Sequence, residues 1–437
     1  MESACLLTHA AGAAQAAGQP GLHEQYDAVR ATSMTLAAPL GAEDCQAQSM
    51  PDCSPVKWHL AHTTCFFETF LLSRFLPSRA AFHPQYRMLF NSYYNAIGDK
   101  HPRPQRGLLT RPALAEILEY RRHVDEGMRT LIGRLGGEPA FDALLALGLN
   151  HEQQHQELIL TDVKHLFHAN PLRPAYAPAG SPALPPGTPA GWTRFDGGAT
   201  RIGHDGTGFA FDNEGPAHEV LLQPYYLADR LVTQHEYLEF IRDGGYRRPE
   251  LWLSLGWERV CAEGWEAPLY WHGQRDQWRV FTLHGMQELE LQAPVTHVSY
   301  YEADAYARWA RVRLPREAEW EHACRRLPAS VHALRANLLE SGHLDPRPAP
   351  PRKEHRGPVQ MYGDTWEWTC SAYGAYPGFR PDPGAVGEYN GKFMCNQYVL
   401  RGGSCATPRG HLRPSYRNFF PPEARWQFTG IRLARDA

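Results

Sequence analysis

The sequence predicts a multidomain protein in which a helical bundle is followed by an irregular α+β region. Residues 22–170 alternate apolar and polar positions at helical spacing in four long runs, which favours an antiparallel four-helix bundle. The proline-dense stretch 171–191 indicates a linker, because proline neither continues a helix nor fits a central strand. From 192 to 437 short aromatic runs alternate with Gly and Pro, and one clear helix is expected at 300–312.

The composition excludes several classes of protein. Apolar residues form 43% of the 437-residue chain and charged residues 21%, as in ordinary globular proteins of two or three domains. A net charge of −3 without a basic stripe gives no reason to expect nucleic acid. No window reaches the roughly 18 apolar residues of a membrane span, and the N-terminus lacks the features of a signal peptide. Nine scattered cysteines without a CxxC pair indicate free thiols and a cytoplasmic location.

Two histidine pairs lie on predicted helices. In NHEQQHQELILTDVKH, His151 and His155 point about 40° apart on one helix face, because each residue turns the chain by about 100°. Glu157 lies too far around that helix to complete a metal site. The run SPVKWHLAHTTCFFETFLL offers His59 and His62, and spacing alone does not choose between them. Three neutral imidazoles with open coordination positions suit zinc or ferrous iron; the alternative is a polar helix face and core histidines.

Six stretches together resemble the ergothioneine-biosynthesis sulfoxide synthases: SPVKWHLAHTTCFFETFLL, NSYYNAIGDKHPRPQRGLLTRP, NHEQQHQELILTDVKH, GDTWEWTCS, VLRGGSCATP and RPSYRNFFPPEARWQFTGIRLARD. The resemblance runs from about residue 22 to the C-terminus. It implies a DinB-like four-helix bundle that carries an iron site at 22–170. It also implies an irregular α+β formylglycine-generating-enzyme-like (sulfatase-modifying-factor-like, C-type-lectin-like) domain at 192–437.

The resemblance also implies a reaction and a cofactor. The family couples a cysteine-type thiol to C2 of the imidazole of Nα-trimethylhistidine (hercynine) with O2, and oxidises the sulfur to the sulfoxide. It implies Fe(II) held by His62, His151 and His155, with Gln154 at the hercynine imidazole. All these substrates are small molecules, so neither nucleic acid nor a membrane is expected as a partner. The oligomeric state stays open.

Four residues near the middle of the helical half match further family positions. The reaction needs a proton or hydrogen-atom donor near the oxygen, and Tyr93 and Tyr94 match tyrosines of the family's iron centre. The sequence does not tell which one is the donor, and aromatic packing is the alternative. Arg103 and Arg106 match the arginines that bind the thiol substrate, since guanidinium grips a carboxylate by two parallel hydrogen bonds. Surface arginines in a loop are the alternative.

A late segment bears on the thiol donor. The family carries an Asn–aromatic–acid triplet there that contacts substrates. Asn418 and Phe419 match it, whereas Phe420 departs from the acid. The missing carboxylate favours free cysteine over gamma-glutamylcysteine. Aromatic faces usually hold trimethylammonium groups, but the sequence does not show which aromatics do so here.

Other functions remain as alternatives. An ovothiol-type synthase joins cysteine to C5 of histidine and generally carries a methyltransferase domain, for which we expect no room here. A non-catalytic carbohydrate- or peptide-binding module would lack metal. A zinc-dependent thiol-S-transferase would be indifferent to oxygen.

The second half resembles formylglycine-generating enzymes only in its fold signature. We expect residues 366–368 (WEW) to be core and turn residues rather than catalysts. We also expect the late cysteines to be small, buried and weakly reactive: Cys370, Cys395 and Cys405.

Overall fold

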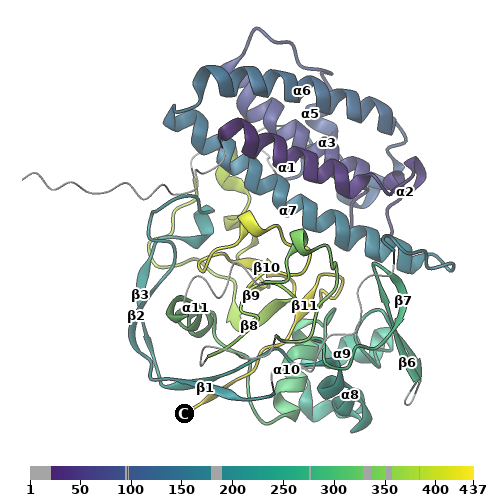
Figure 1. Cartoon of the computed structure of the whole chain (residues 1–437), viewed down its shortest axis with the longest axis vertical. Helices are drawn as coiled ribbons and strands as arrows, with labels where there is room; N and C mark the ends of the chain where they lie inside the picture. Colours follow the sequence, from purple (N-terminus) through teal and green to yellow (C-terminus); the bar gives the residue numbers. More distant parts are fainter. Residues whose placement is uncertain are drawn as a thin grey trace, which may run out of the picture.

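The protein consists of a helical N-terminal part and a sheet-containing C-terminal part, as the sequence predicts (Figure 1). The computed structural model describes residues 21–93, 96, 98–178, 189–274, 277–327, 336–350, 357–382 and 384–437. Residues 179–188 of the predicted linker therefore lie outside the described residues. In Figure 1 the helical part is above the sheets, and α7 runs along the boundary between the two parts.

Four long helices form the first part: α1 (Leu22–Ala37), α3 (Val56–Phe67), α6 (Leu114–Leu135) and α7 (Pro139–Ala169). The short helices are α2 (Ala42–Gln46), α4 (Ser73–Phe75) and α5 (Tyr86–Leu89), and a π-helical turn at Glu68–Leu72 joins α3 to α4. Apolar side chains at three- and four-residue spacing create the core; α6, for example, buries Ile117, Tyr120, Val124 and Met128. None of the helices in the described ranges is both long enough and apolar enough to cross a membrane.

A buried ion cluster fixes α7 against α1 and α6. Arg30 contacts Glu152 at 2.9 Å, Arg121 binds the other oxygen of the same carboxylate, and Ser33 donates to it at 2.6 Å. Burial alone would raise the pKa of Glu152, but Arg121 and Arg30 outweigh it and hold that pKa at about 2. The two guanidinium groups and the carboxylate therefore depend on each other for charge balance.

The described residues of the second part form four small sheets, all antiparallel except for one pair of strands. They are β1 (Trp192–Phe195), β4 (Tyr225–Ala228) and β12 (Ala434–Asp436); β2 (Gly198–Ile202) and β3 (His218–Leu222); β5 (Trp271–Gln274), β6 (Gln277–Thr282) and β7 (Gly285–Glu288); and β10 (Asn418–Phe420), β9 (Tyr398–Arg401), β8 (Trp366–Ala372) and β11 (Thr429–Gly430). Only β11 and β8 pair in parallel. Trp366, Glu367 and Trp368 of β8 are buried, so the prediction that they are core residues is confirmed.

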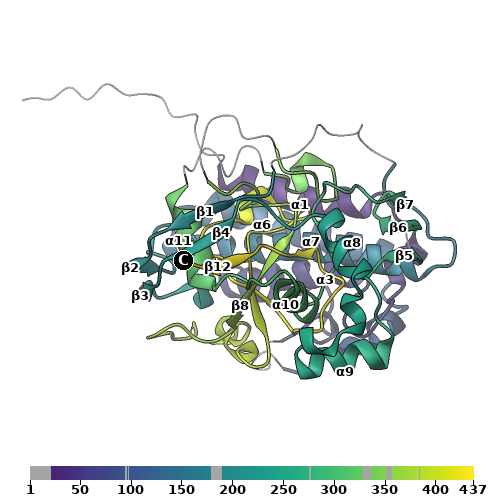
Figure 2. The same cartoon turned by 90° about the horizontal axis from the view of Figure 1, so that it is seen from below.

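Helices of nine or ten residues pack around these sheets: α8 (Gln234–Arg242), α9 (Ser254–Glu263), α10 (Tyr300–Trp309) and α11 (Glu317–Arg326). The helix predicted at 300–312 is α10, so that prediction is confirmed, whereas the sequence analysis did not identify α8, α9 and α11. The helices α8 and α9 are short and contain several charged residues. Helix α11 lacks a continuous apolar stripe and instead buries glutamates that form ion pairs with arginines. Figure 2 shows β2 and β3 on one side of this part and α9 on the other, with β8 between them.

The two parts share one apolar core. A single cluster of buried side chains joins Leu160 and Phe167 of α7 to Tyr270, Phe281 and Phe428 of the second part. The second part is therefore seated on α7, the helix that carries the predicted metal ligands.

Replacing Glu152 by glutamine tests the ion cluster. Glu152→Gln leaves Arg121 buried without a counterion and leaves Arg30 with Asp125 alone, so we expect the free energy of unfolding to fall by about 3–5 kcal/mol. Urea unfolding followed by far-UV circular dichroism measures it. The pKa of Glu152 is depressed in the folded state, so its contribution is complete above about pH 4.5 and is lost as the pH falls towards 2.

Glu126→Gln is the matched control, because Glu126 is exposed and forms only a loose ion pair. The control should unfold like the wild type at every pH. A Glu152→Gln protein with wild-type stability at pH 7 would show that the cluster does not stabilise the fold.

Candidate metal centre and substrate pocket

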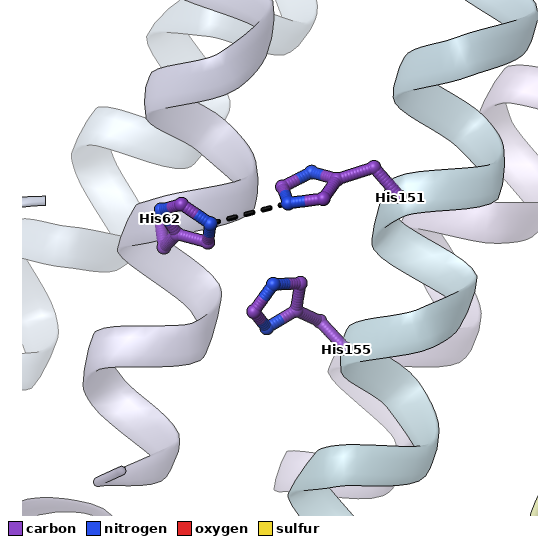
Figure 3. A group of neighbouring side chains, drawn as sticks. All are labelled: His62, His151 and His155. Carbon is purple, nitrogen blue, oxygen red and sulfur yellow. Dashed lines mark hydrogen bonds between the residues drawn. The ribbon is translucent and has the colours of Figure 1, made fainter. Parts of the chain in front are cut away.

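Three histidines from two helices meet inside the bundle. His151 and His155 lie one turn apart on α7, and His62 faces them from α3 (Figure 3). One possible ligand atom from each histidine lies within 4.8 Å of the others. The Nε2 atoms of His62 and His151 are 3.1 Å apart. The structure thus brings together the three histidines that the family resemblance assigned to a metal.

All three imidazoles are neutral at physiological pH. Burial lowers the pKa of His151 to about 4. Burial and the neighbouring imidazoles lower the pKa values of His62 and His155 well below their ordinary range. Neutral imidazole is the form that binds metals, since it offers a free lone pair on one ring nitrogen.

The geometry of these nitrogens fits a divalent metal ion. The Nδ1–H of His62 donates to the carbonyl oxygen of Phe90 at 2.6 Å, which leaves the lone pair of His62 on Nε2. A zinc-bound imidazole nitrogen lies about 2.1 Å from the ion, so two nitrogens bound to one ion are at most about 4.2 Å apart. The spacing of 3.1 Å between the His62 and His151 nitrogens is within this limit.

His59 lies outside this group of three histidines. Its Nδ1 lies 2.8 Å from Nδ1 of His155, and its Nε2 lies 3.0 Å from Oδ2 of Asp162. The three-residue offset on α3 therefore places His62 beside His151, whereas His59 contacts the Nδ1 side of the His155 ring. Sequence spacing could not make this distinction, and it gave no signal for Asp162.

A cavity of about 210 Å³ lies beside the histidines, between the helical part and segments 389–397 and 411–427 of the second part. Because both parts contribute walls, the cavity exists only when they are packed together. Every described residue that the sequence assigned to metal or substrate lines it: His62, Tyr93, Arg103, Arg106, His151, Gln154, His155, Asn418, Phe419 and Phe420.

Arg103 and Arg106 place two positive charges in the cavity wall. Arg106 stacks on Trp58 with its guanidinium carbon 3.4 Å from the ring centre, and Trp58 in turn stacks on His62. Among the described residues neither arginine forms an ion pair, and the Nε of each lacks a hydrogen-bond partner. Burial and the charge of Arg103 lower the pKa of Arg106 to about 9, so it stays charged at neutral pH. The pair is therefore suited to an anionic ligand.

Tyr93 lies at the same wall. Its hydroxyl oxygen accepts a hydrogen bond from Arg103 at 2.9 Å, and its ring packs against Tyr389 and Phe393 of the second part. Tyr94, the other predicted donor, lies outside the described residues. The structure therefore places only the first of the two tyrosines.

Gln154 connects the bundle to a tyrosine that the sequence did not single out. The side-chain amide of Gln154 donates to the hydroxyl of Tyr416 at 2.9 Å, and Nε2 of His411 lies 3.0 Å from the same oxygen. Tyr416 lies two residues before Asn418, so proximity to the matched triplet was the only available signal.

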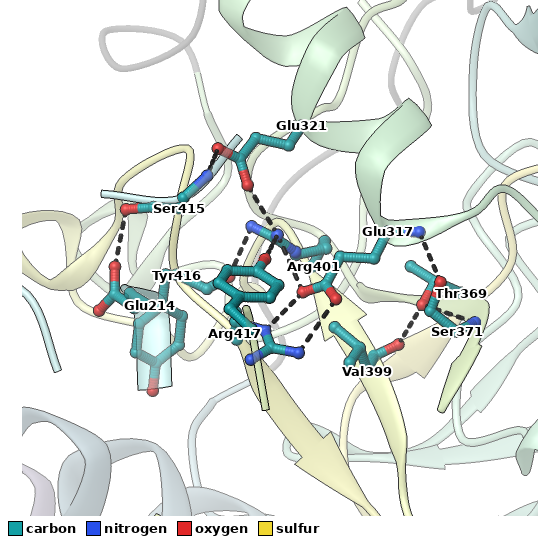
Figure 4. Close-up of polar contacts among 12 residues, drawn as sticks. Glu214, Glu317, Glu321, Thr369, Ser371, Val399, Arg401, Ser415, Tyr416 and Arg417 are labelled. Atoms are coloured by element: carbon teal, nitrogen blue, oxygen red, sulfur yellow. Dashed lines mark hydrogen bonds and ion pairs between the residues drawn. The ribbon is translucent and has the colours of Figure 1, made fainter. Parts of the chain in front are cut away.

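The segment that carries Tyr416 is held by buried ion pairs (Figure 4). Arg401 lies between Glu317 and Glu321 at 2.9 and 2.8 Å, and Arg417 binds Glu317 at 2.7 Å. Ser415 donates to Glu214 at 2.7 Å. This network fixes the backbone on both sides of Tyr416 and orients the segment towards the cavity.

The triplet at 418–420 forms strand β10 at the cavity edge. Phe419 stacks on Tyr373 with ring centres 4.0 Å apart, and Phe420 packs edge-on against Trp426. Asn418 accepts a hydrogen bond from the backbone N–H of Phe419. The position where the family resemblance led us to expect an acid therefore presents an aromatic wall.

The late cysteines are only partly as predicted. Cys405 is buried and Cys370 half-buried, but Cys395 is exposed, so the expectation of three buried thiols is wrong for Cys395. Cys395 lies between β8 and β9, in a surface loop.

Comparison with known families agrees with this architecture. Residues 25–159 match the DinB superfamily. Residues 185–437, more than half of the chain, match the sulfatase-modifying factor enzyme 1-like domain.

Curated relatives match over nearly the full length. The hercynine oxygenase of Mycolicibacterium thermoresistibile is 35% identical over 413 residues, which cover 88% of each chain. That of Mycobacterium tuberculosis is 34% identical over 425 residues, covering 93% of this chain and 96% of the relative. The formylglycine-generating enzyme of Streptomyces coelicolor is 28% identical and aligns with 60% of this chain and 95% of its own length. The chain therefore belongs to the hercynine oxygenase family, in which a DinB-like helical domain precedes a sulfatase-modifying-factor-like domain.

Proposed function

We propose that this protein is an Fe(II)- and O2-dependent sulfoxide synthase of ergothioneine biosynthesis. It joins the sulfur of free cysteine to C2 of the imidazole of Nα-trimethylhistidine and oxidises the sulfur to the sulfoxide. The observation that carries the proposal is a three-histidine centre beside a cavity lined by both domains, in a member of the hercynine oxygenase family.

The reaction balances with one molecule of O2. The thiol S–H and the imidazole C2–H bonds break, and a C–S bond and an S–O bond form. The second oxygen atom leaves as water together with the two hydrogens. O2 accepts four electrons, two from the formation of the C–S bond and two from the oxidation of sulfur.

The three histidines are assigned to Fe(II), and three ligands leave positions open for substrates. The bound metal supplies a Lewis acid that favours the thiolate and a platform that holds both organic substrates together. The neutral state of His62, His151 and His155 supports this assignment, since no proton has to leave a ligand before binding.

We assign the remaining roles to residues of the cavity wall. Arg103 and Arg106 bind the carboxylate of the thiol substrate, since both are charged and have no anionic partner among the described residues. Gln154 contacts the hercynine imidazole, and Tyr416 fixes the direction of its amide. Tyr93 and Tyr94 are the candidate proton or hydrogen-atom donors.

The aromatic wall at 418–420 supports cysteine as the thiol donor. Gamma-glutamylcysteine carries a glutamyl group, and a partly buried aromatic surface would desolvate the ammonium and carboxylate of that group without compensation. Phe420 and Trp426 provide such a surface. Free cysteine lacks the glutamyl group, so in the proposed reaction it would place no additional charged group against this aromatic wall.

The first test is product analysis. The anaerobically purified, Fe(II)-loaded protein receives trimethylhistidine and cysteine, then O2, and mass spectrometry identifies the products. We expect a cysteine–trimethylhistidine sulfoxide. Reactions with gamma-glutamylcysteine and with plain histidine run in parallel and should give much less product.

The other outcomes separate the alternatives. Cysteine sulfinate alone would retain iron and O2 chemistry but refute the proposed second substrate. Preference for histidine would indicate an ovothiol-type synthase. Absence of O2 uptake with every pair would favour a ligand-binding module or a zinc-dependent transferase.

Removing a ligand tests the metal centre. His62→Ala should bind less than one tenth of the iron bound by the wild type after anaerobic loading, because two imidazoles remain and no described carboxylate replaces the third. Product formation should fall by more than about 100-fold. This exceeds the effect of removing a residue that only hydrogen-bonds to a metal ligand, which is about 10- to 100-fold. Iron analysis and product assays measure the two effects.

His235→Ala is the control, because His235 is exposed on α8 and far from the ligand set. It should retain wild-type iron content and activity. Equal sulfoxide formation by an iron-free, zinc-loaded wild type would contradict the iron assignment.

A third test changes the thiol donor. Phe420→Asp should raise kcat/KM for gamma-glutamylcysteine relative to cysteine, because a charge-assisted hydrogen bond to the ammonium of the glutamyl group is worth about 1.5–3 kcal/mol, or roughly 10- to 150-fold. Phe420→Asn is the matched neutral control and should give a smaller shift. An unchanged preference in Phe420→Asp would exclude this position as the determinant of the thiol donor.

A further inference from the structure

A chain of hydrogen bonds runs from a buried carboxylate to the metal centre. Oδ2 of Asp162 on α7 lies 3.0 Å from Nε2 of His59 on α3. Nδ1 of His59 lies 2.8 Å from Nδ1 of the ligand His155. His59 and Asp162 are only 2% and 6% exposed, so water does not compete for these contacts.

One arrangement of protons satisfies this chain together with metal binding. The Asp162 carboxylate only accepts, and the same oxygen also receives the backbone N–H of Ser54 at 2.8 Å. His59 therefore donates from Nε2, and as a neutral imidazole it keeps its lone pair on Nδ1. That lone pair accepts the Nδ1–H of His155.

The consequence is a defined tautomer of His155. With the proton held on Nδ1, the lone pair of His155 lies on Nε2. Figure 3 shows one ring nitrogen of His155 facing His62 and His151 and the other pointing away from them. The nitrogen that points away is the one that His59 engages, so the free lone pair faces the metal position.

The other two ligands are supported differently. Nδ1 of His62 donates to a neutral backbone carbonyl, that of Phe90. Nδ1 of His151 has no partner among the described residues. Only His155 is connected to a negative charge, and a carboxylate partner makes a ligand imidazole more basic than a carbonyl does.

We propose that His59 and Asp162 are positioning residues that hold His155 in the tautomer and orientation required for metal binding. The proposal rests on the proposed metal centre and not on the identity of the organic substrates. The competing explanation is that the pair only satisfies buried polar groups and joins α3 to α7. The two explanations differ in whether metal affinity depends on an acceptor opposite Nδ1 of His155.

The metal affinities of three single variants and one double variant test this hydrogen-bond relay from Asp162 through His59 to His155. Anaerobic calorimetric titration with Fe(II) alone measures affinity, and the absorption spectrum of the Co(II)-loaded protein reports the ligand field. His59→Phe removes the acceptor and Asp162→Asn removes the charge, and each should weaken Fe(II) binding by about 10- to 100-fold. His59→Asn keeps a carbonyl oxygen near the position of Nδ1 and should lose only a few-fold. The double variant His59→Phe/Asp162→Asn should bind no more weakly than the weaker single variant, because both changes interrupt one chain.

Two variants serve as matched controls. His165→Phe alters a half-buried histidine of α7 that is bonded to Ser49, and Asp125→Asn alters a partly buried carboxylate that binds Arg30. Both should retain wild-type affinity for Fe(II). Urea unfolding of every apo-protein separates a change in affinity from a loss of stability, and His59→Asn and Asp162→Asn decide the question if His59→Phe does not fold.

The relay is overturned if folded His59→Phe and Asp162→Asn bind Fe(II) like the wild type, or if His59→Asn binds as weakly as His59→Phe. In either case a wild type that binds Fe(II) and forms the sulfoxide leaves the proposed function intact. A wild type that does not bind Fe(II) overturns both.

Discussion

A buried carboxylate on α7 holds the two domains together. Glu157 accepts hydrogen bonds from Ser404, Thr407 and Trp366 of the second domain, and no cation pairs with it among the described residues. Burial raises the pKa of Glu157, while the three donors oppose that rise. Because a buried carboxylate without such partners is costly, these contacts favour one seating of the second domain on the helix. His155 lies half a turn away, so the same seating closes the cavity over the proposed metal centre.

Two arginines of the cavity wall form no ion pair among the described residues. Three neutral imidazoles contribute no charge, and Arg103 and Arg106 contribute two positive charges without carboxylate partners among the described residues. A divalent metal would add further positive charge. In the proposed reaction, a thiolate and a carboxylate on one small substrate would add negative charge beside these arginines. The one carboxylate linked to a ligand, that of Asp162, acts through His59 and lies outside the coordination set.

The parts of the site that the sequence predicted are those defined by local geometry. His151 and His155 are four residues apart on a helix, so their common direction follows from helical periodicity. The family motifs also led to the cavity residues on α3, on α7 and at 418–420. The choice between His59 and His62 depends on the rotation of α3 against α7, which packing sets. Tyr416 reaches Gln154 over 262 positions of sequence, and no local pattern reports such a contact.

By itself the sequence determined that a helical half precedes an irregular sheet-containing half, that the chain carries the motifs of one enzyme family, and which helix face bears the paired histidines. Periodicity, proline content and motif order can be read from the order of residues along the chain, so they do not require knowledge of the fold. Only the tertiary structure showed that α8, α9 and α11 form and that Cys395 is exposed. It also showed that Asp162 contacts His59, which in turn contacts His155. These features depend on long-range packing and ion pairing, because the partner that stabilises each of them lies in a distant part of the chain.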